Sequence, residues 1–357
     1  MIDDTIDPWG QVNVKDYDAL CKKFGIKSFS NLMEKVKSPP IYMRRGVVFG
    51  HKDFELVLKA IKEKKGFVMM TGLMPSGSFH FGHKLVADQI VYYQKLGAEC
   101  YIAAADLEAY LTRDMPLDKA RKIAIEEYLL NYIALGLKPE KTHFYFQTQG
   151  KKKYMNLSKF ISKKTTFNEI KAIYGEITPG KIISALTQVA DILHPQLKEF
   201  GGPRPTIVPV GADQLPHINF ARDIAARMKT EHKFMLPSAT FHTLIPGLQG
   251  GKMSSSVPES CIFLSDSPKT VKKKIMKYAF SGGQATIEEH RKLGGNPDVD
   301  ISFQWLKQMF EDDDKKIEKI EDTIKCPECG NEDITMVGDP EHNDFWYCDK
   351  CKYHGGI

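Results

Sequence analysis

The 357-residue sequence has no long apolar run, no basic leader at its start and no large excess of charge of either sign. No segment approaches the roughly eighteen consecutive apolar residues that a membrane-spanning helix needs, so we expect no membrane partner. The first ten residues, MIDDTIDPWG, are acidic and lack the apolar stretch of a secretory signal, which favours the cytoplasm. A net charge of +5 permits a nucleic-acid partner without arguing strongly for one.

Cysteine is scarce until the end of the chain. Of the seven cysteines, three are scattered through the first 261 residues, which does not resemble a disulfide framework. The other four have C-x2-C-x18-C-x2-C spacing and are Cys326, Cys329, Cys348 and Cys351. Two close pairs of thiolates match the closed ligand set of a structural Zn2+ site. We therefore predict a zinc ribbon over residues 325–357, with strands at DITMV and DFWYC and a metal that supplies most of its folding energy.

Short apolar runs alternate with amphipathic stretches through the middle of the chain. The runs FVMM, AECYIAAAD, KTHFYFQ and TIVPVG are typical of buried strands. The stretches HKLVADQIVYYQKLG, ARKIAIEEYLLNYIALG and ADQLPHINFARDIAARM have the period of amphipathic helices. This order predicts an α/β fold, a doubly wound parallel sheet of the Rossmann type.

The chain should divide into four parts. We expect an N-terminal helical region over 1–65 and a Rossmann-like catalytic domain over 66–265, with a lysine-rich insertion near 150–180. A helical region over 266–324 and the zinc ribbon over 325–357 would follow.

The stretch PSGSFHFGHK, residues 75–84, joins the first predicted strand of the sheet to its first helix. Nucleotides bind at such junctions in doubly wound folds. His80 and His83 are three residues apart, so their side chains can lie on one face of the helix. Gly82 has no side chain to keep a ligand from the backbone, and the N–H groups of the helix N-terminus can donate to phosphate. The two histidines could instead be ordinary polar residues at a helix start, or metal ligands, although the sequence offers no third ligand nearby.

A second candidate loop is GGKMSSS, residues 250–256. Lys252 supplies a point charge and the serines from Ser254 to Ser256 supply hydroxyl donors, a combination that suits a pyrophosphate leaving group. The alternative is a flexible surface loop.

The HxGH and KMSSS segments, in this order, resemble the HIGH and KMSKS signatures of class I aminoacyl-tRNA synthetases, with Ser255 in place of the second lysine. Four further stretches resemble tryptophanyl-tRNA synthetases of the archaeal and eukaryotic type. They are DPWG (7–10), RRGVVFGHKD (44–53), TTFNEIKAIYG (165–175) and AFSGGQATIEEHRKLGGNPDVDISF (279–303). The resemblance covers about residues 7–322 and implies activation of tryptophan by ATP and its transfer to tRNA(Trp).

The resemblance also implies a set of nucleotide-site residues. ATP-binding residues would be Thr71, Gly72, His80, Gly82, His83, Gly211, Asp213, Lys252, Met253, Ser254 and Ser255. Among them, His80, His83, Lys252 and Ser254 would be catalytic. Asp213 would orient its loop or hold ribose, and Mg2+ would bridge phosphate oxygens without a dedicated protein cage.

The tryptophan pocket would contain Met70, Glu108, Gln188, Asp191 and Gln214. Asp191 stands where bacterial tryptophan enzymes have an acceptor for the indole N–H, and Met70 would pack on the ring. Tyrosine enzymes also have this Asp, but they have a Tyr at the Met70 position. Eukaryotic tryptophan enzymes have a Tyr there and a Gln at the Ala103 position, so Asp191 would replace both. Glu108 would meet the substrate ammonium, or alternatively form a structural ion pair.

The partners follow from the same resemblance. The tract 151–171 contains seven lysines and one glutamate and would contact tRNA phosphates, although a solvated helix face is the alternative. KTVKKKIMKY, from Lys269, is a weaker candidate, and 266–324 would be a tRNA-binding region. Family resemblance implies a homodimer. The zinc ribbon replaces helices that help to bind the anticodon in this family, so anticodon recognition stays open.

Three other functions compete with this hypothesis. The protein could be a tyrosyl-tRNA synthetase, because the Asp191 position is shared with tyrosine enzymes. It could be a synthetase paralogue that binds RNA without charging it, as the altered pocket and tail would allow. It could also be a nucleotidyltransferase of the broader HxGH group, although those proteins are usually shorter and need no lysine-rich insertion.

Overall fold

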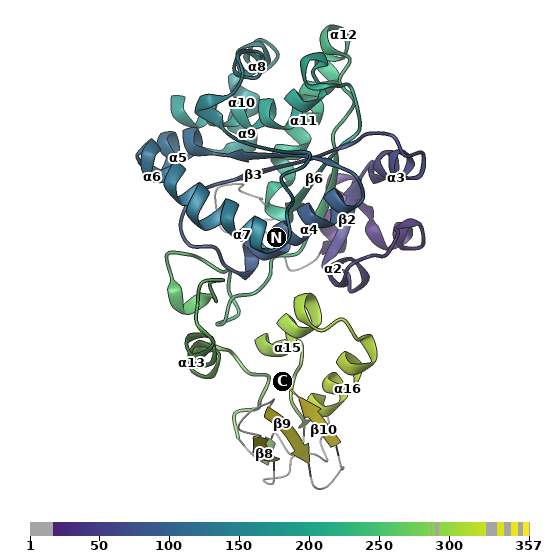
Figure 1. Ribbon diagram of the computed structural model, residues 1–357, viewed down its shortest axis with the longest axis vertical. Coiled ribbons are helices and arrows are strands. Elements are labelled where there is room, and N and C mark those ends of the chain that lie inside the picture. Colours follow the sequence, from purple (N-terminus) through teal and green to yellow (C-terminus); the bar gives the residue numbers. More distant parts are fainter. Residues whose placement is uncertain are drawn as a thin grey trace. The chain divides into compact units, whose positions relative to one another are not determined.

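The computed structural model describes residues 17–286, 288–289, 293–325, 334–338, 344–348 and 353–356, the last three segments by their backbone (Figure 1). The chain divides into two compact units, residues 1–244 and 245–357. The HxGH segment therefore belongs to the first unit and the KMSSS segment to the second.

The first unit is built on a seven-stranded mixed sheet. In spatial order its strands are β1 (Lys27–Ser28), β2 (Val48–Lys52), β7 (Ser238–His242), β6 (Thr206–Gly211), β3 (Val68–Leu73), β4 (Glu99–Ala104) and β5 (Thr142–Phe146). The five strands from β7 to β5 are parallel, which confirms the predicted Rossmann-like sheet. The region 1–65, expected to be helical, also contributes β1 and β2, because β2 pairs antiparallel with β7.

The parallel strands are nearly continuous runs of buried residues. Val68, Met69 and Met70 on β3 are at most 1% exposed, and Ile207 on β6 is fully buried. Strands covered on both faces need apolar side chains in both directions, which explains why FVMM and TIVPVG lack alternation. These residues form the core beneath the site.

Helices cover both faces of this sheet, with α10 and α11 on one side and α4 and α7 on the other (Figure 1). The helices and helical turns of this unit are α1 (Tyr17–Phe24), η1 (Phe29–Lys35), α2 (Ile41–Arg44), α3 (Phe54–Lys62), α4 (Phe81–Lys95), α5 (Asp106–Arg113), α6 (Leu117–Ile123), η2 (Ala124–Leu129), α7 (Leu130–Ala134), η3 (Gln147–Gln149), α8 (Lys152–Ser162), α9 (Phe167–Tyr174), α10 (Pro179–Leu193), η4 (His194–Gln196), η5 (Lys198–Phe200), η6 (Ala212–Gln214), α11 (Leu215–Arg227) and α12 (Lys229–His232).

The strand order reverses between β3 and β6. From β3 the chain proceeds outward through β4 and β5, and it then returns to β6 on the other side of β3 before reaching β7. Loops that leave the carboxyl ends of strands on either side of such a reversal diverge and open a crevice. Here those loops are the segment from β3 into α4 and the segment from β6 through η6 into α11.

The second unit contains helices and a small sheet. Its elements are η7 (Pro258–Ser260), α13 (Pro268–Tyr278), α15 (Ile301–Trp305), η8 (Leu306–Phe310), α16 (Asp314–Lys325), β8 (Ile334–Gly338), β9 (Asp344–Cys348) and β10 (Tyr353–Gly356). The three strands are antiparallel in the order β10-β9-β8, and β8 and β9 confirm the strands predicted at DITMV and DFWYC. Cys326, Cys329 and Cys351 lie outside the described residues, and Cys348 is described only as the last backbone position of β9.

Within the described part of the chain, no helix combines the length and the apolar character that crossing a membrane requires.

Candidate nucleotide and amino-acid site

His80 and His83 form a capping box at the start of α4. His80 is the N-cap residue, and its Nδ1 accepts a hydrogen bond from the N–H of Gly82 at 3.2 Å. The Nδ1 of His83 accepts from the N–H of His80 at 3.3 Å. In a capping box the N-cap residue and the third residue of the helix are three positions apart in sequence. The reciprocal hydrogen bonds therefore explain the spacing of the two histidines. The rings stack 3.8 Å apart, with 18° between their planes.

This geometry fixes where the imidazole protons lie. In a neutral imidazole one nitrogen accepts and the other carries the proton, so an accepting Nδ1 leaves the N–H on Nε2. Both rings can therefore present Nε2–H donors at the first turn of the helix. That turn also carries the unsatisfied backbone N–H groups and the positive end of the helix dipole, which favour phosphate.

Two aromatic residues support the histidine pair, Tyr128 on the helical segment η2 and Phe79 just before α4. Tyr128 lies 5.0 Å from the His83 ring, and its hydroxyl is 3.5 Å from His83 Nε2. Phe79 packs on both His83 and Tyr128, and its N–H donates to Glu127 at 3.2 Å. Sequence reasoning missed Tyr128 and Glu127, because they belong to a helix 45 residues further along.

The remaining predicted nucleotide residues of this unit stand at the ends of β3 and β6. Thr71 and Gly72 are near the carboxyl end of strand β3, and a Cβ atom added to Gly72 would meet no neighbour within 4 Å. Gly211 ends β6, and a Cβ atom there would collide with the Asp213 carboxylate. Glycine thus allows Asp213 to fold back over the strand end, where its Oδ2 accepts a hydrogen bond from Gln214 at 3.3 Å.

Three of the predicted tryptophan-site residues belong to one buried hydrogen-bonded cluster. Gln188 donates to Glu108 Oε2 at 3.0 Å, and the N–H of Glu108 donates to Gln147 Oε1 at 3.2 Å. Gln147 in turn donates to Asp191 Oδ2 at 2.7 Å. The Oε1 atom of Gln188 is buried and has no hydrogen-bond partner in the described structure. An acceptor in that state is suited to a donor from a ligand.

Asp191 is only 4% exposed and accepts two further hydrogen bonds, from Tyr145 at 2.9 Å and from Tyr154 at 2.6 Å. Burial raises the pKa of its carboxyl to about 7, the three donated hydrogen bonds oppose the rise, and the charge of Glu108 adds to it. Sequence reasoning missed Tyr145, Gln147 and Tyr154. The position of Gln147, directly after the buried strand β5, was the one available signal.

Met70 and Gln214, the other two predicted tryptophan-site residues, do not take part in the hydrogen bonds of this cluster. Met70 is 1% exposed and belongs to the same hydrophobic core cluster as Ala103 and Tyr154. Met70 is thus part of the apolar core of the first unit. Gln214 contacts Asp213 on the β6 side of the crevice.

The KMSSS loop, within the second unit, is held at its base by backbone contacts. Pro246 and Lys252 form an isolated bridge, and the N–H of Gly247 donates to the carbonyl of Gly251 at 2.6 Å. The N–H of Ser254 donates to Ser260 Oγ at 3.2 Å. Met253 is buried and anchors the loop, whereas the side chain of Lys252 is exposed.

Further along, Ser254 Oγ and Ser256 Oγ lie 2.8 Å apart. The loop therefore presents one lysine and neighbouring hydroxyls on a fixed base.

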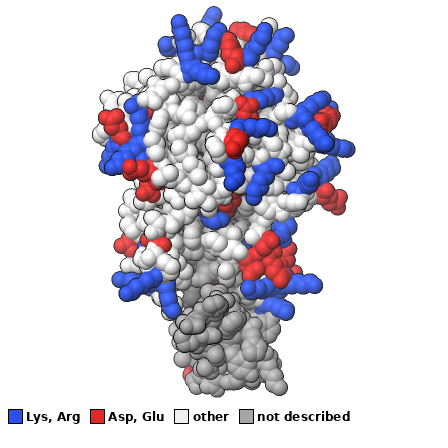
Figure 2. All heavy atoms as spheres, in the orientation of Figure 1, with Lys and Arg blue, Asp and Glu red and all other residues white. Residues whose placement is uncertain are grey.

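The lysine-rich tract forms α8 and α9 of the first unit. Figure 2 shows Lys and Arg side chains gathered over α8 and α12. Lys152, Lys159 and Lys163 are exposed, as is the ring of Phe160, which is 54% exposed. The TTFNE stretch is a capping box in which Thr166 and Glu169 bond reciprocally, so this part of the motif has a structural explanation.

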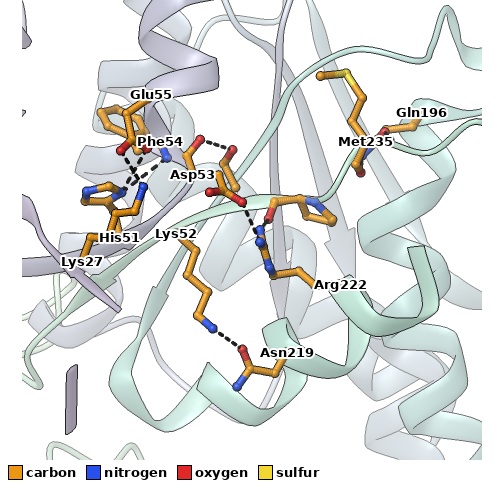
Figure 3. Close-up of polar contacts among 12 residues, drawn as sticks. Lys27, His51, Lys52, Asp53, Phe54, Glu55, Gln196, Asn219, Arg222 and Met235 are labelled. Carbon is orange, nitrogen blue, oxygen red and sulfur yellow. Dashed lines mark hydrogen bonds and ion pairs between the residues drawn. The ribbon is translucent and has the colours of Figure 1, made fainter. Parts of the chain in front are cut away.

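The RRGVVFGHKD stretch ties the sheet edge to α11 (Figure 3). Arg222 donates to Asp53 at 2.6 Å and to the carbonyl of Pro237 at 2.6 Å. Ser238 donates to the carbonyl of Asp53 at 2.7 Å, and Lys52 donates to Asn219 at 2.7 Å. These contacts join β2, β7 and α11, which gives this motif a structural role.

Comparison with known proteins agrees with this geometry. Residues 62–337 match the family described as tRNA synthetases class I (W and Y). The tryptophan–tRNA ligase of Aeropyrum pernix is 46% identical, with 92% of this chain and 91% of that protein covered. The tryptophan–tRNA ligase of Methanocaldococcus jannaschii is 45% identical, with 90% and 88% covered. The chain belongs to the tryptophanyl-tRNA synthetase family.

Solved structures agree with the family assignment. The crystal structure of the Aeropyrum pernix K1 tryptophanyl-tRNA synthetase matches this synthetase with a TM-score of 0.84 at 46% identity, covering 90% of this chain and 89% of that one. The Plasmodium falciparum tryptophanyl-tRNA synthetase matches with a TM-score of 0.75 at 33% identity, covering 87% and 86%. The matched family region of the synthetase contains both the HxGH and the KMSSS segments.

Proposed function

We propose that this protein is a tryptophan–tRNA ligase, which activates tryptophan with ATP and transfers it to tRNA(Trp). The observation that carries the proposal is the convergence of three neighbouring strands at one edge of the sheet. The segment after β3 carries His80 and His83, α5 after β4 carries Glu108, and η3 after β5 carries Gln147. Parallel strands present their carboxyl ends at the same edge, where ligands of doubly wound folds bind.

The nucleotide is expected at the His80–His83 turn. Nε2–H groups and backbone N–H groups would donate to the α-phosphate, while Gly72 leaves room for close approach. The residues Thr71, Gly82, Gly211 and Asp213 would complete the nucleoside and phosphate contacts. Lys252 would stabilise charge on the leaving pyrophosphate, with Met253, Ser254 and Ser255 holding the loop and donating hydrogen bonds.

The amino acid is expected at the buried cluster. The Glu108 carboxylate and the unpartnered Oε1 of Gln188 are two acceptors for the substrate ammonium. Asp191 would accept the indole N–H, and Met70 would pack on the ring. An unpaired buried acceptor penalises a ligand that lacks the matching donor, which favours tryptophan over other apolar amino acids.

The activation step needs no general base, because the tryptophan carboxylate is already a nucleophile. The tryptophan carboxylate attacks the α-phosphorus, the bond to the β-phosphate oxygen breaks, and pyrophosphate leaves with that electron pair. In the second step a ribose hydroxyl at the 3′ end of the tRNA attacks the carbonyl carbon, the bond from that carbon to the phosphate oxygen breaks, and AMP leaves with the electron pair and takes up the hydroxyl proton on its phosphate. Positioning and charge stabilisation would supply the rate enhancement.

Magnesium, when bound with ATP, neutralises charge on the phosphate oxygens. It keeps several waters and takes ligands mainly from phosphates, so it requires few protein groups. The described residues contain no group of three or more His, Cys, Asp or Glu arranged to hold a metal.

Two surfaces of the first unit are assigned to partners. The exposed lysines of α8 and α9 would meet tRNA phosphates. The segment from α6 to α7 exposes Ile125, Leu130 and Ile133 at 42%, 54% and 52%, an apolar strip that a second copy of the chain would cover in a homodimer. A monomer in sedimentation analysis would remove the homodimer from this proposal.

A structural zinc site near the end of the sequence is part of the proposal. Cys326, Cys329, Cys348 and Cys351 have C-x2-C-x18-C-x2-C spacing, and four thiolates with that spacing would supply the closed tetrahedral donor set that Zn2+ prefers. Of these four residues the structure describes only the backbone of Cys348, at the end of β9, where it pairs with Ile334 of β8 and Tyr353 of β10. One zinc per chain in metal analysis is expected, and a folded, metal-free sheet would refute it.

Aminoacylation of total tRNA with each amino acid tests the proposal. We expect tryptophan alone to be attached, and attached only to tRNA(Trp). Attachment of tyrosine instead would identify a tyrosyl-tRNA synthetase. Tryptophan-dependent exchange without any charging would identify a paralogue that binds RNA.

A further inference from the structure

The carboxylate of Asp191 is enclosed by three hydrogen-bond donors, which all come from residues 145–154. The hydroxyls of Tyr145 and Tyr154 both donate to Oδ1, at 2.9 and 2.6 Å. The amide of Gln147 donates to Oδ2 at 2.7 Å. The donors come from β5, η3 and α8, whereas Asp191 is on α10. We call these three donor residues the Asp191 cage.

The cage leaves one acceptor position on the carboxylate. An ionised carboxylate has about four lone-pair positions, two on each oxygen. Both positions of Oδ1 are taken by the tyrosines and one position of Oδ2 is taken by Gln147. The Gln147 amide cannot flip without loss, because its Oε1 accepts the N–H of Glu108 at 3.2 Å. The open position on Oδ2 is therefore fixed in direction.

We propose that Tyr145, Tyr154 and Gln147 are positioning residues that set the selectivity for an indole N–H, by holding Asp191 with one acceptor position open. This inference rests on the proposed function, because it assumes that tryptophan is the substrate. The family pocket residues expected from the sequence do not include these three. They act through Asp191 and not by touching the substrate.

The competing explanation is that the cage is purely structural and fastens α8 and β5 to α10. Tyr-to-Phe substitutions separate the two roles, because they keep the rings and their packing. Both tyrosine rings lie against His194, at 5.2 Å for Tyr145 and 4.8 Å for Tyr154, and phenylalanine preserves those contacts. Only the hydroxyl donors to Asp191 are removed.

The charged state of Asp191 depends on the groups that face it. These are Glu108 from α5, Tyr145 from β5, Tyr154 from α8 and His194 from η4. His194 stays neutral near pH 7, because burial lowers its pKa to about 4. Since the tyrosine hydroxyls stabilise the ionised carboxylate, removing one raises the pKa of Asp191 above its present value of about 7. Acceptance of an N–H then requires a higher pH.

The test compares tryptophan with β-(3-benzothienyl)alanine, an analogue of the same shape with sulfur in place of the indole N–H. The kcat/KM for each is measured by amino-acid-dependent ATP–pyrophosphate exchange between pH 6 and 9. We expect wild type to prefer tryptophan and Tyr154→Phe to reduce that preference about tenfold at pH 7, the weight of one hydrogen bond to a charged group. The preference of Tyr154→Phe for tryptophan should return as the pH rises and Asp191 ionises. This return should need a higher pH in the variant than in wild type.

Two further variants complete the experiment. Tyr145→Phe removes the other donor to Oδ1 and provides the same test should Tyr154→Phe fail to fold. Tyr93→Phe, on α4 and outside the cage, removes a buried hydroxyl that lies 3.4 Å from Thr240 Oγ1 of β7, and it should leave the preference unchanged.

An unchanged tryptophan preference in both cage variants, with rates for the two ligands reduced equally, would show that the cage is structural. Wild type without tryptophan-dependent exchange would overturn the proposed function itself, which is a distinguishable result.

Discussion

The imidazole rings of His80 and His83 stack 3.8 Å apart, and the N–H of His80 donates to His83 while the His80 ring accepts from Gly82. The Nδ1 atom of each histidine thus accepts a hydrogen bond in the helix cap, and the Nε2–H group of each can donate to a ligand. The three-residue spacing serves the helix cap, and it would serve the proposed phosphate site as well. The two tasks can be separated by substitution.

Substitution of His80 by Asn should slow catalysis strongly but keep the helix cap. The Asn Oδ1 can replace Nδ1 as the cap acceptor, whereas nothing replaces the Nε2–H donor. We expect kcat for tryptophan activation to fall about 100-fold, with unfolding free energy within about 0.5 kcal/mol of wild type. His80→Ala should lose activity similarly and also lose about 1 kcal/mol of stability. Full activity in His80→Asn would remove the imidazole from the chemistry.

Substitution of Glu108 by Gln should weaken recognition of the substrate ammonium. Wild type should bind tryptophan more tightly than indole-3-propionate, which lacks the amino group, because Glu108 and Gln188 offer acceptors to it. We expect Glu108→Gln to raise the Kd for tryptophan about 30-fold, the weight of a charged hydrogen bond, and to leave the Kd for indole-3-propionate nearly unchanged. Calorimetry measures both, and equal losses for the two ligands would indicate a structural role for Glu108.

Substitution of Lys252 by Ala should affect the chemical step. A lysine that stabilises the leaving pyrophosphate acts in the transition state, so we expect kcat for exchange to fall about 100-fold with little change in the KM for tryptophan. Lys315→Ala, which removes an exposed lysine on α16, is the matched control and should behave as wild type. A rise in the tryptophan KM without loss of kcat would assign Lys252 to substrate binding.

Stability should fall as the pH is lowered from 7 to 5. Burial lowers the pKa of His194 to about 4, of His217 to about 3 and of His242 to about 4, so these three stay neutral when folded and gain protons on unfolding. Asp191 opposes them, because its carboxyl, with a pKa of about 7, releases a proton on unfolding. Near pH 5.5 unfolding should therefore take up about two protons net, and its free energy should fall by about 3 kcal/mol per pH unit.

Denaturant unfolding at pH 7.5, 6.5 and 5.5 measures this slope. The stabilising contribution of the histidines is fully present above their unfolded pKa of about 6.5 and is lost as the pH falls towards 4. Constant stability across this range would mean that the histidines are protonated within the folded chain.

The fold was largely predictable from the sequence because apolar residues form short continuous runs in its buried strands and recur every three to four positions in its helices. FVMM followed by an amphipathic stretch gave β3 and α4, and TIVPVG gave β6. The short strands β2 and β7 were missed, because neither the RRGVVFGHKD stretch nor SATFH has a clear local signal. They become strands through tertiary pairing, because β7 adds in parallel to β6 and β2 then pairs antiparallel with β7.

The site was predictable where local motifs encode it and not where tertiary contacts do. The His80–His83 pair is contained in four consecutive residues, so the sequence displays it. The residues of the Asp191 cage precede Asp191 by 37 to 46 positions, and Tyr154 is embedded in a lysine-rich tract that otherwise indicates a solvated surface. Its buried hydroxyl is evident only once α8 packs on α10.

The most direct test of the whole account is ATP–pyrophosphate exchange by the purified protein with tryptophan and with tyrosine as the only amino acid. A buried acceptor for the indole N–H and two acceptors for the ammonium should make tryptophan the better substrate by a factor of about 1,000 or more. Exchange that is equal for the two amino acids, or faster with tyrosine, would contradict the assignment of the Asp191 pocket to tryptophan.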